Sequence, residues 1–249
     1  MMNLRFADRG DNVSPFLYLI YFAYAPALAL LWYFYHQDRL EPEPKRIVLG
    51  TFLLGGTLSV GVALILESVL VPRWFPRIPA LLPATFLYVA LVAGIVEEPA
   101  KALAIRYAYN SGQLYGIMDG VIYGVAAGLG FAATENLLYG LGYGLQVTIQ
   151  RALLTPIGHA TWSAIVGVGY GLKAEGKVFT TIPYFTLAIL LHFLWDYYAF
   201  MSTVSPVYYL MILLIFTINI VIIRWLVILG KREDMERFWW YILMGGRRW

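Results

Sequence analysis

Cysteine is absent from this chain of 249 residues, and charged residues are scarce, at 13% of the total. Without cysteine there can be no disulfide bridge, thiolate metal site or cysteine nucleophile. Soluble domains carry about 25% charged residues, so the low charge excludes an ordinary water-exposed surface. A net charge of only +3 gives no reason to expect a nucleic-acid partner.

Long hydrophobic runs stand in place of the missing charge, and 60% of the residues are hydrophobic. About 20 apolar residues cross a bilayer as a helix. The sequence therefore predicts an all-α fold, a polytopic membrane helix bundle in which residues 1–249 form a single integral-membrane domain in the lipid bilayer. About seven spans are expected, at about 15–35, 47–70, 83–106, 117–141, 156–172, 178–201 and 207–229.

Two segments have a less regular pattern. Thr155-Pro156 is typical of an N-cap followed by proline at the first helical position, which would start the fifth span there. Alternatively, that helix starts near Leu145 and bends at Pro156. The tail at 236–249 contains an aromatic run too short to span, which predicts a separate C-terminal interfacial helix.

The basic residues indicate the orientation in the membrane. With the N-terminus outside, the cytoplasmic loops and the C-terminal tail would hold most of the lysine and arginine residues. The positive-inside rule then predicts a multi-pass protein of the cell membrane, with its N-terminus outside and its C-terminus in the cytoplasm.

Several ionisable residues lie within otherwise apolar spans, where each charge costs roughly 2.5 to 3.5 kcal/mol. Carboxylates and imidazoles transfer protons and activate water, so we expect these residues to act together. They are Glu97, Glu98, Glu135, His192 and Asp196, with Lys101 and His159 close by.

The third span carries Glu97-Glu98-Pro99-Ala100-Lys101. Glu97 and Lys101 are four residues apart and share a helix face, whereas Glu98 points about 100° away. We therefore expect the lysine to hold one acid while the other faces a different group. The simpler interpretation is an inter-helix ion pair, for which one acid would suffice.

The fourth span contains glycines at a strict spacing of four, which predicts close packing against a neighbouring helix. The stripe consists of Gly116, Gly120, Gly124 and Gly128. Glu135 lies on nearly the same face and should point into the protein, where Asn136 beside it can hydrogen-bond a neighbour. The alternative for Glu135 is a protonated, hydrogen-bonded core acid.

The sixth span contains His192 and Asp196 four residues apart, a spacing at which the aspartate can fix the imidazole tautomer. Such a pair serves a general base, an oxyanion donor or a metal ligand equally well. The alternative is a pair that only satisfies its own hydrogen bonds. For His159, a functional and a structural role remain equally open.

Other polar residues suggest no chemistry. Arg151 is interpreted as an interfacial anchor, and Asp119 is expected to cap the fourth span. Asp38 and Glu67 fall near the ends of spans.

Taken together, these motifs resemble those of the PrsW family of intramembrane proteases, which is related to the type II CAAX prenyl endopeptidases. Four motifs in order on separate spans make the resemblance specific, and it covers about 38–200. The matching residues are Glu97-Glu98-x-x-Lys101, Phe131-x-x-x-Glu135 with Asn136, His159 of Thr-Pro-x-x-His, and His192-x-x-x-Asp196.

The resemblance implies an endopeptidase that cuts a membrane-associated protein, as in the site-1 cleavage of an anti-sigma factor that starts a signalling cascade. It implies Glu97 as the general base, with Glu98 and Lys101 supporting it. His192 would stabilise the tetrahedral oxygen or assist proton transfer.

Two positions depart from the pattern of the CAAX relatives, because Asp196 stands where they have asparagine and Glu135 where they have histidine. An acid at 196 favours the cationic form of His192 and hence oxyanion stabilisation. His159 would supply the imidazole that Glu135 does not.

We expect a metal-free glutamic mechanism without a cofactor. The alternative is a zinc ion held by Glu135, His159 and His192, a two-histidine, one-carboxylate set with an open position.

The main alternative from another class is a proton-coupled transporter, because intramembrane acids and histidines also form proton relays. Matching interrupted segments in the two halves, which transporters often contain, are not evident. A third interpretation is a scaffold that binds a partner helix through the glycine stripe. For a peptidase, the rise of 1.5 Å per residue along each helix predicts a site between the midplane and the outer leaflet, so that cleavage occurs near the extracytoplasmic side.

Overall fold

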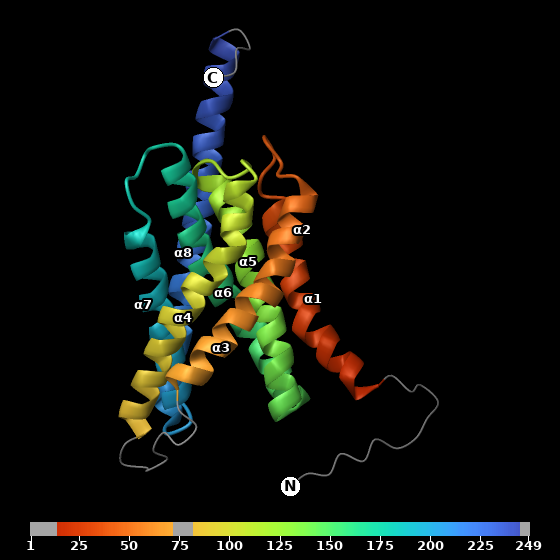
Figure 1. Ribbon diagram of the computed structural model, residues 1–249, viewed down its shortest axis with the longest axis vertical. Helices are drawn as coiled ribbons and strands as arrows, with labels where there is room; N and C mark the ends of the chain where they lie inside the picture. The colour runs from red at the N-terminus through yellow and green to blue at the C-terminus, as the bar shows by residue number, and fades with distance from the viewer. Residues whose placement is uncertain (1–13, 72–81, 245–249) are drawn as a thin grey trace.

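The computed structural model describes residues 14–71 and 82–244, which form a bundle of helices without strands (Figure 1). The predicted fold class is confirmed. A π-helical turn at Gly55–Ser59 joins α2 to α3, so these two helices correspond to one predicted span. The helices are α1 (Pro15–Tyr35), α2 (Lys45–Leu54), α3 (Val60–Leu70), α4 (Leu82–Asn110), α5 (Gly116–Tyr143), α6 (Leu145–Ala174), α7 (Ile182–Met201) and α8 (Tyr209–Leu243).

Within the described residues, four helical segments are long and apolar enough to cross a membrane: α1, the joined α2–α3, α5 and α8. The chain is therefore a multi-pass membrane protein. The helices α4, α6 and α7 complete the bundle and carry most of the ionisable residues singled out above.

The helix α5 lies in the middle of the bundle, and 89% of its most apolar stretch is buried. It packs on α6 along the predicted glycine stripe. A Cβ atom on Gly124 would overlap the carbonyl oxygen of Ser163, and one on Gly128 would overlap that of His159. Larger residues at these positions would therefore force the two helices apart.

The helix α6 begins at Leu145 and continues through Pro156, so the second of its two predicted starts is correct. Thr155 does not cap a helix, because its hydroxyl lies within hydrogen-bonding distance of Asn136 Oδ1 and of the Arg151 carbonyl. His159 consequently lies in the interior of a 30-residue helix rather than in a first turn.

The prediction of a separate interfacial helix at 236–249 is wrong over its described part. The helix α8 continues without a break to Leu243 and projects beyond the other helices (Figure 1). Glu233 holds this extension to the start of α5, since its carboxylate accepts a hydrogen bond from the backbone N–H of Ile117 at 2.7 Å. Glu233 also pairs with Arg237 one turn later, at 3.3 Å. Residues 245–249 lie outside the described part.

The helix α3 is a loose wall of the bundle. Val60 and Ala63 are its only buried residues, and most of its other side chains are exposed. Figure 1 shows α3 leaving the π-helical turn and slanting toward the far end of α4. A cavity lined by α3, α4, α5 and α7 lies on this side of the bundle.

Candidate active site

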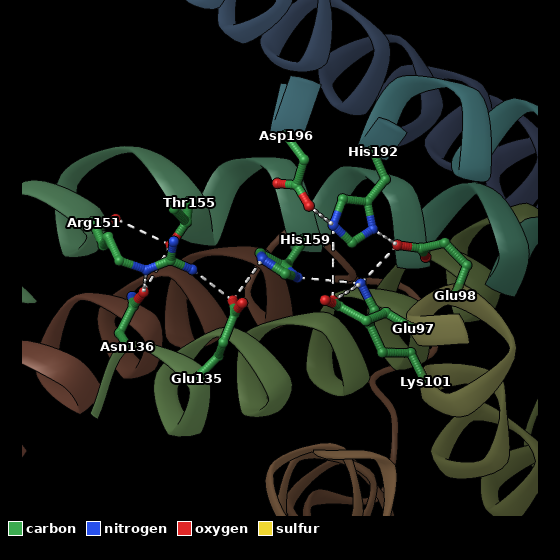
Figure 2. Close-up of polar contacts among 10 residues, drawn as sticks. All are labelled: Glu97, Glu98, Lys101, Glu135, Asn136, Arg151, Thr155, His159, His192 and Asp196. Atoms are coloured by element: carbon green, nitrogen blue, oxygen red, sulfur yellow. Dashed lines mark hydrogen bonds and ion pairs between the residues drawn. The ribbon is translucent and has the colours of Figure 1, made fainter. Parts of the chain in front are cut away.

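Side chains from α4, α5, α6 and α7 converge in one polar cluster (Figure 2). Five of its members are at most 5% exposed, whereas the Glu135 and Asp196 side chains are 18% and 23% exposed. So many buried ionisable groups are tolerated only when they pair with one another. The cluster unites all the residues that the sequence singled out: Glu97, Glu98, Lys101, Glu135, His159, His192 and Asp196.

On α4, the lysine pairs with both acids rather than with one of them, and it lies closer to Glu98. The Lys101 ammonium donates to Glu98 Oε1 at 2.6 Å and lies 3.6 Å from Glu97 Oε2. The residue at the spacing of three is therefore the closer partner, although the spacing of four had suggested Glu97. Glu97 Oε2 is buried and accepts no hydrogen bond within the described residues.

On α7, His192 is surrounded by carboxylates. Its Nδ1 lies 2.8 Å from Glu98 Oε1, and its Nε2 lies 3.4 Å from Asp196 Oδ2 and 3.7 Å from Glu97 Oε2. Protonation of both ring nitrogens lets each one donate to a carboxylate, which is the arrangement that this geometry favours. Trp162 stacks on the ring at 4.2 Å and fixes its plane.

On α6, the partners of His159 define its tautomer. Lys101 Nζ lies 3.1 Å from Nδ1, and since an ammonium can only donate, Nδ1 accepts. The proton of the neutral ring therefore sits on Nε2, which points at Glu135 Oε2, 3.2 Å away. In this state, His159 links the lysine of α4 to the carboxylate of α5.

Arg151 belongs to the cluster, and its interpretation as an interfacial anchor is wrong. It donates to Glu135 Oε2 at 2.7 Å and to Asn136 Oδ1 at 3.0 Å. Its guanidinium also lies 3.8 Å from the ring centroid of Tyr139. The adjacent acid and amide of α5 could have indicated a bidentate partner, but nothing in the sequence identified the arginine.

The cluster borders a cleft of about 250 Å³ between α3, α4, α5 and α7. Glu97, Glu135 and Asp196 line it, together with apolar side chains such as Leu64 and Phe200. Glu67 also lines the cleft with a buried, unpartnered Oε1, although the sequence had suggested only a residue near a span end. The acids therefore form the polar wall of an otherwise apolar recess.

Three of these residues could hold a metal ion. One ligand atom each from Glu97, Glu135 and His159 lies within 4.8 Å of the other two. This set differs from the predicted zinc set, because it contains Glu97 where the prediction had His192, whose ring nitrogens both face carboxylates.

The set fits a divalent metal in the type and spacing of its donors, and the unpartnered Oε2 of Glu97 supports the fit. One condition applies to His159. Its Nε2 can ligate only after losing its proton, which requires Lys101 to move off Nδ1.

Helices that cross the bilayer, and buried acids and imidazoles beside an apolar cleft, define the class of this protein: a membrane-embedded enzyme with hydrolytic groups inside the helix bundle. A family model described as PrsW family intramembrane metalloprotease matches residues 43–223. The chain belongs to this family and is an intramembrane protease. Membership selects the protease over the transporter and the scaffold.

Individual relatives agree with the family model. The chain is 33% identical over 224 residues to Protease PrsW of Shouchella clausii, which covers 88% of this chain and 98% of the relative. It is 36% identical over 178 residues to Protease PrsW of Geobacillus kaustophilus, covering 70% and 76%. It is 30% identical over 178 residues to Protease PrsW of Bacillus subtilis, covering 70% and 78%. No solved structure matches the chain.

Proposed function

We propose that the chain hydrolyses a peptide bond of a membrane-associated protein in this cleft, with Glu97 as the general base. One observation carries the proposal. Glu97 lines the cleft with a buried carboxylate oxygen that accepts no hydrogen bond from residues 14–71 or 82–244. A water molecule in the cleft would fill that position and give its proton to Glu97 during attack.

The groups behind Glu97 serve to position it. Glu98 Oε1 interacts with both Lys101 and His192, which ties α4 to α7. Two groups that can carry positive charge then lie within 3.7 Å of Glu97 Oε2 and hold that carboxylate in place. Glu98 and Lys101 are therefore positioning residues.

His192 is the proposed electrophilic group. Its Nε2 faces Glu97 and Asp196, both of which line the cleft. A cationic imidazole there would donate to the oxyanion that develops as water attacks the carbonyl. Asp196 would hold the ring in that state.

Glu135 lines the same cleft as Glu97, and His159 lies behind it with Nε2 facing its carboxylate. A divalent metal held by Glu97, Glu135 and His159 would supply a bound water of lowered pKa and a Lewis acid for the carbonyl. The contacts of Glu98, Lys101 and His192 fix the Glu97 carboxylate whether it serves as base or as ligand. Because His159 Nε2 carries a proton in this arrangement, we favour the role of base.

The substrate is proposed to be a protein with a single membrane span, such as an anti-sigma factor cut at site 1. The apolar side chains of the cleft suit a segment that arrives from the bilayer. A helix is about 10 to 12 Å across and does not fit a recess of about 250 Å³. The scissile bond would therefore be presented in an unwound segment.

The decisive test compares wild type with Glu97→Gln, each purified and incubated with a single-span substrate. Loss of a general base should lower the cleavage rate by about 10² to 10⁴-fold. The control is Glu236→Gln, an exposed residue of the α8 extension, which should cleave at the wild-type rate. Cleavage by both Glu97→Gln and wild type, or by neither, would reject the proposal.

Elemental analysis of the same preparations separates the two roles of Glu97. If wild type contains no stoichiometric zinc or other transition metal, or if Glu97→Gln loses activity with an unchanged content of that metal, Glu97 is the base, as we expect. If the Glu97→Gln variant loses a bound metal that wild type contains, together with its activity, Glu97 is a metal ligand.

A further inference from the structure

A second cluster of acids lies at the opposite end of α5 from the candidate active site. One carboxylate oxygen each from Asp38, Glu43 and Asp119 lies within 4.8 Å of the other two. Asp38 and Glu43 belong to the loop between α1 and α2, and Asp119 lies in the first turn of α5. More than four helical turns, or roughly 24 Å, separate Asp119 from Glu135, so the two clusters are distinct.

The carboxylates of this cluster are buried but incompletely paired. Asp38 is 5% exposed, and while its Oδ1 accepts from the backbone N–H of Glu41 at 3.2 Å, its Oδ2 is buried without any hydrogen bond within the described residues. Glu43 accepts a short hydrogen bond from the Tyr123 hydroxyl. Asp119 Oδ2 accepts from the backbone N–H of Tyr115 at 2.9 Å. These donors are neutral, and Glu43 and Asp119 also lie within hydrogen-bonding reach of each other, where without a cation they would share a proton.

Among the described side chains, no base forms a direct ion pair with the three acids, and Arg237 acts on Asp119 only from beyond ion-pair distance. Arg237 and Lys177 pair with Glu175 and Glu233, and Lys231 donates to Gln37.

A fourth acid adds to the imbalance, since buried Asp234 of α8 is repelled by Asp38 and Asp119. The cluster therefore has a deficit of positive charge.

We propose that Asp38, Glu43 and Asp119 bind a hard divalent cation, Mg²⁺ or Ca²⁺. Carboxylate oxygens are the ligands these ions prefer, and the absence of histidine from the set disfavours zinc. The buried Oδ2 of Asp38 supplies a ligand atom to which no donor in the described part of the chain is bonded. The bound ion ties the loop between α1 and α2 to the first turn of α5.

The test uses the full chain in detergent, stripped of metal with EDTA and titrated separately with MgCl₂ and CaCl₂. Isothermal titration measures binding, and thermal unfolding measures stabilisation. We expect about one equivalent of cation per chain and a rise in Tm of roughly 5 to 10 °C at 100 times the Kd. The titration with the lower Kd identifies the ion.

Three variants locate the ion. Asp38→Asn should abolish both the binding and the rise in Tm, and in EDTA it should be at least as stable as wild type, because it relieves repulsion. That comparison also shows that the variant folds. Glu41→Gln is the matched control, since this exposed acid of the same loop keeps its backbone contact with Asp38 and should bind normally. Glu97→Gln should also bind normally.

Three outcomes would overturn the proposal. Absence of binding in wild type would mean that the acids share protons only. Unchanged binding in Asp38→Asn would place the ion elsewhere, and loss in Glu97→Gln with retention in Asp38→Asn would place it in the candidate active site.

Discussion

Individual residues show where the sequence was sufficient and where it was not. The motifs on α4, α5, α6 and α7 predicted which acids and histidines meet, because each motif carries ionisable groups that an apolar span would otherwise exclude. Spacing along one helix could not reveal partners across helices. The sequence therefore assigned no catalytic role to Arg151, six positions after the start of α6, or to Glu67 of α3. Both side chains nevertheless reach the site.

Arg151 gives the prediction at this scale. Arg151→Ala would leave Glu135 without its strongest partner, so cleavage of a single-span substrate should fall at least tenfold, with a lower Tm. Arg151→Lys should give an intermediate rate, because an ammonium keeps the charge but cannot bridge Glu135 and Asn136 with the same fork. Arg106→Ala, at an exposed arginine of α4, is the control. Equal rates for all three variants would show that the bridge has no part in activity.

At the scale of elements, hydropathy predicted most helices to within a few residues, whereas both irregular segments were misjudged in part. Proline at position 156 does not start α6, because Gly144, with a φ of 94°, already provides the turn after α5. The tail remains part of α8, because Glu233 ties it to the start of α5 by contacts that no local pattern reveals. A local turn decided the first case, and a long-range contact decided the second.

The glycine stripe leads to a prediction about packing. Gly124→Val would insert a branched side chain where α5 touches the α6 backbone, so the free energy of unfolding should fall by about 1 to 3 kcal/mol or more. Thermal unfolding in detergent measures the change. Gly142→Val is the control on the same helix, because a Cβ there meets nothing within 4 Å. A Gly124→Val protein as stable as the control would contradict the close contact.

At the scale of the whole molecule, the proposed orientation places the N-terminus outside and the candidate active site in the extracytoplasmic half of the bundle. The positive-inside rule supports it. The absence of cysteine makes it testable by labelling, since every introduced thiol is the only one in the chain.

Two single-cysteine variants check the orientation. Tyr143→Cys, at the exposed end of α5, should react with a membrane-impermeant maleimide on intact cells. Ser111→Cys, in the exposed turn after α4, should react only after the membrane is opened. The reverse pattern would invert the protein and move the site to the cytoplasmic half.

The glycine stripe packs α5 tightly against α6, whereas α3 packs loosely, and this difference determines where substrate can enter the cleft. Separating α5 from α6 would open a void along their interface. We therefore expect these two helices to stay in place when substrate enters. The helix α3 buries only two residues and is joined to α2 by a π-helical turn, so displacing it forfeits little packing. We therefore expect substrate to enter the cleft on the side of α3. An inhibitor bound between α3 and α4 would block this entry without contacting a catalytic group.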